Sequence, residues 1–355
     1  MTPFSEVVSA ADWNAVDVPK RAPMHHYIWV QACFETLYPT DAPIVFSNGT
    51  DEGGGFGAFV ARGGFPKRYF LVGAEELGEP IDLVFPDYAG ADALARRVVA
   101  AGKAMRFGHF PASSNFLSAL KTQSKGRGVL AQAEERGSPY IDLDDSWRDP
   151  LSHFNSRRRS DFRRMVRRAE KIGEIRTQII MPNQRQAQDY LAQAVEIEAK
   201  SWKTRTGTAI ELNPEQSSFY RRYVDLASEA GILRYAFLRI GDRLAAMQIA
   251  LECDDGFWLL KIGYDEDFAK CSPGNLLMRD TVSYAAEKGL KTYEFLGKSA
   301  AWTALWTDKE RPNVKLRYYP FTPSGILALA QDSGQIGLKR LRAKLAAKTK
   351  GKGRA

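Results

Sequence analysis

The sequence has few cysteines and no long hydrophobic run. Cys33, Cys253 and Cys271 are widely separated and form no Cys-x-x-Cys pair, so neither a disulfide framework nor a zinc site is expected. No segment approaches the roughly 18–20 consecutive apolar residues that cross a bilayer. The first residues lack the basic region followed by an apolar region that is typical of a signal peptide. These absences predict a protein of the reducing cytoplasm.

Several motifs of common enzyme classes are also missing. The sequence contains no P-loop Gly-Lys-Ser/Thr and no glycine spacing of a dinucleotide-binding fingerprint. The four histidines, His25, His26, His109 and His153, are not set at metal-ligand spacing. No serine or cysteine stands in a nucleophilic constellation. We therefore expect no metal and no covalent nucleophile.

The excess of positive charge is confined to the C-terminal end. The net charge is +8, and residues 337–355 contain eight basic residues and no acid, so residues 1–336 are formally neutral. This distribution argues against a general nucleic-acid-binding surface. The tail is either a solvated end or a docking element for a polyanion. Anionic lipid would attract it by about 1 kcal/mol per basic residue.

The length of 355 residues and the 44% hydrophobic content predict two globular domains. We expect mixed α/β domains over residues 1–148 and 149–325, followed by a basic helical tail over 326–355. The polar, proline-containing stretch 144–150 marks the boundary. Apolar runs in the first half predict strands at residues 44–46, 57–61, 68–72, 81–85 and 104–110 and helices at 25–37 and 91–101.

The second half shows a regular succession of elements. Its patterns predict a helix at 156–172, a strand at 174–181, helices at 185–203 and 214–230, strands at 233–240, 244–252 and 257–264, a helix at 275–288, and strands at 292–296 and 314–319. The three strands from residue 233 onward form an antiparallel meander, because a tight Ile240-Gly-Asp-Arg turn joins the first two.

The turn before the helix at 275–288 is the sharpest local signal. Ser272, Pro273 and Gly274 precede an apolar-periodic helix. Free N–H groups at a helix start bind anions, and glycine lets the backbone approach a phosphate. An ordinary capped helix after a loop is the alternative.

Glu294 lies within the apolar strand Tyr293-Glu-Phe-Leu-Gly. If burial raises its pKa, this carboxylate could accept a proton from an attacking amine, directly or through water. The alternative is a carboxylate that faces solvent or pairs with an arginine.

Two pairs of residues with large side chains could line a substrate pocket. Trp302 and Trp306 are four residues apart, which predicts a shared helical face. Trp202 and Lys203 end an earlier predicted helix. Flat apolar rings suit a sugar or a pantetheine arm, and core packing is the alternative for both pairs.

The helix at 156–172 carries seven arginines around an apolar stripe. Arg157 and Arg158, at its start, are best placed to contact an anionic substrate or cofactor. The alternatives are a solvated surface helix, whose arginine stems cover the core, and a nucleic-acid contact.

Several of these stretches together resemble a known family. Ser156-Arg-Arg-Arg-Ser-Asp-Phe-Arg-Arg-Met-Val-Arg-Arg-Ala-Glu-Lys resembles the arginine-rich helix of GNAT-type acyltransferases associated with bacterial cellulose and exopolysaccharide synthesis. The hairpin from Ile240 is similar to their central hairpin, and Lys261-Ile-Gly-Tyr-Asp, Ser272-Pro-Gly-Asn-Leu-Leu and Glu294-Phe-Leu-Gly follow in the same order. The resemblance covers roughly residues 150–320. The relatives include the Fem-type transferases, which are built from two tandem GNAT-like halves.

The resemblance implies a fold of two tandem GNAT-like domains, the first of them degenerate, and an acyl-coenzyme A donor, with acetyl-coenzyme A expected. The donor's pantetheine arm would pair with the strand at Lys261, Ile262 and Gly263. Its pyrophosphate would bind at Ser272, Pro273, Gly274, Asn275 and Leu276. The sequence departs from the family where Lys298 follows Gly297 and where Trp302-Thr303 replaces a Tyr-Lys pair.

The resemblance further implies N-acylation of an amino sugar or another saccharide intermediate of a surface polysaccharide. The acceptor would be a small-molecule or lipid-linked saccharide, at the inner face of the membrane if the basic tail docks there. Two alternatives stay open. One is a Fem-type transfer from aminoacyl-tRNA to a peptidoglycan precursor, which is the one reading that involves nucleic acid. The other is a non-enzymatic docking protein of a polysaccharide-synthesis complex.

Overall fold

The computed structural model describes residues 2–49, 54–201, 207 and 210–335. Eleven strands of these residues form one continuous mixed sheet in the order β1-β2-β3-β4-β11-β5-β10-β9-β8-β7-β6. The strands are β1 (Ile44–Asn48), β2 (Gly55–Arg62), β3 (Arg68–Leu71), β4 (Met105–Pro111), β5 (Gly128–Asp142), β6 (Ile175–Ile180), β7 (Leu233–Ile240), β8 (Arg243–Cys253), β9 (Gly256–Tyr264), β10 (Thr292–Glu294) and β11 (Glu310–Pro320).

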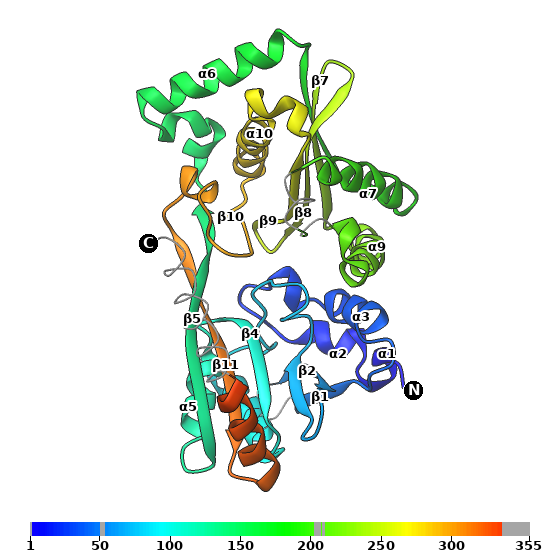
Figure 1. Cartoon of the computed structure of the whole chain (residues 1–355), viewed down its shortest axis with the longest axis vertical. Helices are drawn as coiled ribbons and strands as arrows, with labels where there is room; N and C mark the ends of the chain where they lie inside the picture. Colours follow the sequence, from blue (N-terminus) through cyan, green and yellow to red (C-terminus); the bar gives the residue numbers. More distant parts are fainter. Residues whose placement is uncertain (1, 50–53, 202–206, 208–209, 336–355) are drawn as a thin grey trace, which may run out of the picture.

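The helices pack on both faces of this sheet (Figure 1). The α-helices are α1 (Phe4–Val7), α2 (Ala10–Ala15), α3 (Tyr27–Thr36), α4 (Tyr88–Ala100), α5 (Asn115–Gln123), α6 (Ser156–Glu170), α7 (Gln184–Ala199), α9 (Pro214–Glu229) and α10 (Pro273–Glu287). Short 3₁₀ turns include η3 (Asp145–Arg148), η6 (Glu266–Cys271) and η7 (Thr303–Leu305). Residues 323–335 are also helical. No helix within the described ranges is long and apolar enough to cross a membrane.

The same arrangement of strands and helix occurs in both halves of the chain. In the first half, β1, β2 and β3 are antiparallel, and α4 leads to β4, which is parallel to β3. In the second half, β7, β8 and β9 are antiparallel, and α10 leads to β10, which is parallel to β9. Each half therefore contains one parallel pair of strands joined by a helix, and the two pairs can be compared position by position.

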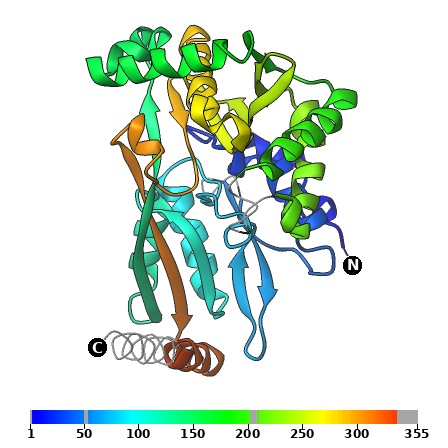
Figure 2. The same ribbon diagram turned by 45° about the horizontal axis from the view of Figure 1, so that its top comes forward.

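The two halves are joined by long strands. β5 pairs with β10 through its last residues and with β11 along most of its length, and β11 also pairs with β4 of the first half. Figure 2 shows β5 and β11 side by side, with the helical residues 323–335 beyond the end of β11. The ranges predicted for the two domains remain predictions, because the sheet runs through both halves without a break.

The helices of the second half cover opposite faces of the meander β7–β9. α10 packs on one face through Leu276, Leu277 and Val282, which are fully buried. α7 and α9 pack on the other face, and α9 also contacts α3 of the first half. At that contact the rings of Phe219 and Tyr223 each lie 4.9 Å from the ring of Trp29. The first half therefore contacts the second on the α7/α9 side of the meander, opposite α10.

Most predicted elements of the first half are confirmed, but the strand expected at 81–85 is wrong. Only Val84 pairs with a strand there. It forms an isolated bridge with Phe56, in which the two residues exchange two backbone hydrogen bonds. Pro80 and Pro86 flank the run, and proline has no N–H to donate to a sheet. The apolar residues are buried all the same, which is why their pattern was strand-like.

Asp82 in this segment gives the stability of the protein a pH dependence. Burial raises the pKa of its carboxyl to about 7, although Ser114 and the Leu83 N–H donate hydrogen bonds to it. The folded protein therefore holds this proton more tightly than the unfolded chain, so the stability that Asp82 contributes is lost as the pH rises from about 4 to about 7.

We expect the Asp82→Asn variant to lack this loss. Between pH 5 and pH 8 the wild-type protein should lose about 2 kcal/mol of unfolding free energy relative to the variant. Urea denaturation of both proteins at the two pH values measures the difference. An identical pH dependence in the two proteins would show that Asp82 is ionised in the folded state.

Candidate active site

The parallel pair β9/β10 opens toward the C-terminal ends of its strands. Pairing runs from Thr292 opposite Gly256 to Glu294 opposite Trp258. β10 ends there, whereas β9 continues to Tyr264 along β8. After Glu294 the chain turns away through Leu296 and Gly297, both with positive φ. The strands therefore diverge beside Lys261–Gly263, where the donor's arm was predicted to bind.

The start of α10 faces the loop at the end of β9. Ser272 has a left-handed backbone (φ 48°) and joins η6 to α10, and its side chain makes no capping hydrogen bond. The N–H groups of Asn275 and Leu276 donate to the Ser272 carbonyl. No acceptor is found for the Gly274 N–H within the part of the chain that the structure describes. No acid lies in the first turn, so the positive end of the helix is available to an anion.

The corresponding helix of the first half begins differently. α4 is capped by Asp87, whose carboxylate accepts a hydrogen bond from the Gly90 N–H. A negative side chain thus already occupies the position that an anionic ligand would take. Of the two equivalent helices, α10 is therefore the one suited to bind a phosphate.

The two glycines of the predicted donor site serve different purposes. A Cβ atom on Gly274 would lie 3.8 Å from the Tyr264 ring, an ordinary contact, so the position is open. A Cβ atom on Gly263 would lie 3.0 Å from Glu198 Cα and 3.1 Å from Met247 Cε. Gly263 is therefore needed to let α7 pack closely on β9, whether or not a ligand binds there.

An arginine that the sequence did not single out lies beside the α10 turn. Arg168, at the end of α6, donates a hydrogen bond to the Lys270 carbonyl (3.0 Å), two residues before Ser272. Arg157 and Arg158, the predicted anion contacts, lie at the other end of α6. Arg157 is exposed, and Arg158 donates to the Leu305 carbonyl (2.8 Å). The end of α6, rather than its start, brings positive charge to the turn.

Glu294 lies at the centre of a buried ionic cluster. Its side chain is 2% exposed, and Arg311 of β11 donates to both of its oxygens, at 2.9 and 2.7 Å. Lys20 donates to Oε1 (2.9 Å) and to the Thr292 hydroxyl (3.0 Å). The Arg311 guanidinium also lies over the Tyr140 ring, 3.9 Å from its centroid. The cluster therefore joins the N-terminal segment, β5, β10 and β11.

The alternative in which Glu294 pairs with an arginine is confirmed, and the raised pKa that its role as a proton acceptor was made to depend on is not found. Burial by itself would raise the pKa of Glu294, but Arg311 and Lys20 outweigh it and hold the pKa below its usual value. The two cations come from segments far from β10 in the sequence, which is why the apolar setting of the strand suggested the opposite direction. Glu294 is thus a carboxylate at neutral pH, and its catalytic role stays a prediction.

The two predicted tryptophans do not share a face. Trp302 is 36% exposed and packs on the edge of Phe295 (5.7 Å between centroids). Trp306 is 4% exposed and packs against Phe154 and Phe162. The segment between them is the 3₁₀ turn η7, which has three residues per turn, so positions four apart diverge. Trp306 is therefore a residue of the hydrophobic core.

The remaining predicted site residues can be placed only in part. Trp202 and Lys203 lie outside the described residues. Lys261 points toward α9, where its ammonium lies over the Tyr220 ring (5.1 Å). Within the described part of the chain, no group of three acidic, histidine or cysteine side chains could hold a metal ion.

The comparisons with known proteins agree with this geometry. Residues 156–303 match the family described as Acetyltransferase (GNAT) domain. No curated protein matches the sequence. The match covers the arginine-rich helix, the meander, the α10 turn and β10, so this stretch carries a GNAT-type acetyltransferase domain.

Three solved structures share the fold at low sequence identity. FemX has a TM-score of 0.57 at 12% identity, over 90% of this chain and 97% of its own. A conserved protein of unknown function from Bacteroides thetaiotaomicron gives 0.53 at 11%, over 88% and 97%. The C-terminal domain of a putative lysylphosphatidylglycerol synthetase from Agrobacterium fabrum gives 0.51 at 13%, over 86% and 95%. The expected mixed α/β, GNAT-like fold is confirmed.

Proposed function

We propose that this protein is an acyl-coenzyme A-dependent N-acyltransferase that acetylates the amine of an amino sugar or another saccharide intermediate of exopolysaccharide synthesis. The observation that carries the proposal is the start of α10. An uncapped helix N-terminus, with an open glycine and no acid in its first turn, lies at the diverging end of a parallel strand pair. It does so within the stretch that matches the acetyltransferase domain.

The residues at this turn fit a coenzyme A pyrophosphate. The Gly274 N–H and the positive end of α10 supply hydrogen-bond donation and a favourable dipole, typically about 0.3–1 kcal/mol. The Arg168 guanidinium is held close by through Lys270. The Lys261–Gly263 backbone of β9 would orient the pantetheine arm. The bound donor supplies a thioester carbonyl, which is electrophilic without help from a metal or a protein nucleophile.

The chain's own task is then to position a neutral amine and to receive its proton. Positioning accounts for much of the rate in such transfers, because it removes the entropy of encounter. In this proposal Glu294, ionised at the end of β10, would receive the proton through a water molecule, because its carboxylate is 2% exposed and already accepts hydrogen bonds from Arg311 and Lys20. The acceptor would be a small-molecule or lipid-linked saccharide on the cytoplasmic side, and residues 337–355 would attract anionic lipid.

A second candidate is aminoacyl transfer from charged tRNA, as in Fem-type relatives. The observation that favours it is the outer face of α6. Arg157, Arg163, Arg164 and Arg167 are all exposed there, on the side of the helix away from Phe162 and Ala169. Such a row could contact RNA phosphates, and the fold likeness to FemX is compatible with it.

Calorimetry distinguishes the two donors. We expect the full-length protein to bind acetyl-coenzyme A with one site per chain, with little dependence on ionic strength above 0.2 M. We expect charged tRNA to bind only at low salt, with an affinity that falls steeply as salt rises, as in non-specific binding. Tight tRNA binding at 0.2 M salt together with no binding of acetyl-coenzyme A would overturn the proposal in favour of the second candidate.

A further inference from the structure

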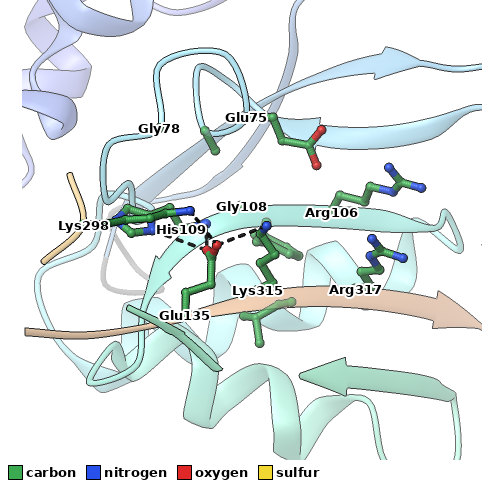
Figure 3. A pocket seen from close by; sticks show the side chains of 12 residues that line it. Glu75, Gly78, Arg106, Gly108, His109, Glu135, Lys298, Lys315 and Arg317 are labelled. Carbon is green, nitrogen blue, oxygen red and sulfur yellow. Dashed lines mark hydrogen bonds and ion pairs between the residues drawn. The ribbon is translucent and has the colours of Figure 1, made fainter. Parts of the chain in front are cut away.

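A cavity of about 340 Å³ lies at the parallel pair β3/β4 of the first half, and β11 and Lys298 of the second half also line it. Phe70 pairs with Arg106 there, and the two strands then diverge, as β9 and β10 do in the second half. The cavity begins at this divergence, over Gly108 and beside Glu75 (Figure 3). It corresponds in the first half to the place where the donor is proposed to bind in the second.

Basic side chains line this cavity. Arg106 and Arg317 are direct cross-strand partners on β4 and β11, and Lys315 lies two residues before Arg317 on the same face of β11. Like charges directly opposite each other destabilise a sheet. Lys298 approaches from the segment after β10. Figure 3 shows Arg106 and Arg317 near one end of the cavity and Lys298 near the other, with Lys315 between them.

Acidic side chains only partly neutralise the positive charge of these four basic residues. Asp332 contacts Arg106 (3.0 Å), Arg317 (3.8 Å) and Arg68 (2.9 Å), and Glu135 contacts Lys298 (3.0 Å) and Lys315 (3.1 Å). The lining itself holds four cations, Arg106, Lys298, Lys315 and Arg317, and two acids, Glu75 and Glu135, which leaves an excess of two positive charges. The side chains of Arg317, Lys298 and Lys315 are 33%, 47% and 55% exposed, so their charged groups remain accessible to a ligand.

The wall of the cavity is tied to the segment that follows Glu294. The Gly297 carbonyl accepts hydrogen bonds from the Ser138 hydroxyl (2.7 Å) and lies 3.0 Å from His109 Nε2. The Gly297 N–H donates to Glu79 (3.0 Å). Lys298 is four residues from Glu294, so their Cα atoms are at most about 14 Å apart. One ligand could therefore contact the basic cavity and reach the end of β10.

The arrangement of Ser138, His109 and Glu135 does not make this cavity a hydrolase site. His109 Nε2 lies 3.5 Å from the Ser138 hydroxyl and Nδ1 lies 3.4 Å from Glu135. Ser138 is 2% exposed, donates to Gly297 and accepts from Asn313 (2.9 Å). The hydroxyl is thus used to hold the 295–299 segment and is closed to a substrate.

We propose that this cavity binds an oxyanion, a phosphate or carboxylate group, carried by the acceptor substrate. Arginine and lysine together favour such groups, because guanidinium binds them through paired hydrogen bonds and ammonium as a point charge. The assignment to the acceptor rests on the proposed function, whereas the oxyanion site itself does not. A phosphate would come from a nucleotide-linked or lipid-linked saccharide, and a carboxylate would come from an acidic sugar.

The test is calorimetric titration of the full chain at low salt with inorganic pyrophosphate and, separately, with glucuronate. We expect the Lys315→Gln/Arg317→Gln variant to bind the preferred probe at least tenfold more weakly than the wild-type protein. Lys121→Gln/Lys125→Gln removes the same charge from exposed positions on and after α5 and should bind as the wild-type protein does. Because the α10 turn is itself proposed to bind a pyrophosphate, the pyrophosphate titrations are made in the Gly274→Asp background. Tighter pyrophosphate binding there identifies a phosphate-bearing acceptor, and tighter glucuronate binding identifies an acidic sugar.

Two further measurements keep this site distinct from the donor site. Gly274→Asp should retain the probe in the cavity, and Lys315→Gln/Arg317→Gln should retain acetyl-coenzyme A. If wild-type protein binds neither probe, or if the double variant binds both as well as the charge-matched control does, the cavity is not an oxyanion site. Failure of acetyl-coenzyme A to bind would instead overturn the donor assignment and leave the result for this cavity intact. The single Lys315→Gln variant, at an exposed position, serves if the double variant does not fold.

Discussion

Replacement of Gly274 by aspartate is expected to weaken the binding of acetyl-coenzyme A at least tenfold without destabilising the fold. The new carboxylate would stand at the second position of α10, where the donor's pyrophosphate is proposed to bind, and like charges would repel. A tenfold change corresponds to about 1.4 kcal/mol of binding free energy. Calorimetry gives the affinity, and thermal unfolding gives the stability.

The structure indicates that this variant folds. Gly274 has no positive φ, and a Cβ atom there would meet only the Tyr264 ring at 3.8 Å. An acid in the first turn of a helix is also favourable, by about 0.3–1 kcal/mol. We therefore expect an unchanged or slightly raised melting temperature, which separates loss of binding from loss of folding.

Ala89→Asp provides a matched control. Ala89 is the second residue of α4, the equivalent helix of the first half, and it is exposed. This substitution adds the same charge at the same helical position, but in the half of the chain that does not contain the proposed donor site. Acetyl-coenzyme A should bind it as tightly as it binds the wild-type protein. Equal weakening by both substitutions would mean that net charge, and not the α10 turn, governs the affinity.

The local elements around α10 could be predicted from the sequence because each depends on its own residues. The predicted strand at 233–240 coincides with β7, and the helix predicted at 275–288 is α10, which begins two residues earlier, at Pro273. The fixed φ of proline suits the first position of a helix, so the boundary could have been placed there. The turn that carries the functional proposal was thus visible before the structure.

The electrostatics of Glu294 could not be predicted in this way. Its two cationic partners lie 274 and 17 residues away in the sequence, on Lys20 and Arg311. Periodicity shows that a strand residue is buried, but it does not show which charges other segments bring to it. The direction of the pKa shift depends on that balance. Arg168 was missed for a similar reason, because seven arginines on one helix differ only in what packs beside them.

The strand pairing between the halves was equally hidden. Residues 128–142 contain alternating polar residues and few large apolar ones, so no strand pattern stands out in them. β5 nevertheless forms there because β11 and β10 supply its ladder partners. The same pairing creates the basic cavity, since it places Arg317 opposite Arg106 across more than two hundred residues of sequence.

Replacement of Glu294 by glutamine is expected to lower the turnover number by about a hundredfold, the size typical of losing a positioned proton acceptor. The Glu294 pKa lies below its usual value, so the carboxylate is ionised throughout the neutral range. The ratio of wild-type to variant turnover should therefore be nearly constant from pH 6 to pH 9. A ratio that changes tenfold within this range would show that another group accepts the proton.

The same variant tests how much the ionic cluster stabilises the fold. Glutamine leaves Arg311 and Lys20 without their carboxylate, and breaking such a buried pair costs about 3–5 kcal/mol, less here because both cations are partly exposed. The contribution of Glu294 is present above pH about 4.5, the usual pKa of a glutamate, and is lost as the pH falls through the lowered pKa. Urea denaturation at pH 7 should therefore show a loss of about 1–3 kcal/mol, and the difference between variant and wild type should shrink in acid.

Glu252→Gln is the control that separates catalysis from stability. Glu252 accepts a hydrogen bond from the guanidinium of Arg234 (2.9 Å) and another from the Tyr284 hydroxyl, in a partly buried pair on the adjoining part of the sheet. Its loss should destabilise the fold by a comparable amount but leave turnover at 25 °C within about twofold, because the protein remains folded. If Glu294→Gln and Glu252→Gln reduce turnover equally, Glu294 acts only by holding Arg311 and Lys20, and the proton must leave the amine by another route.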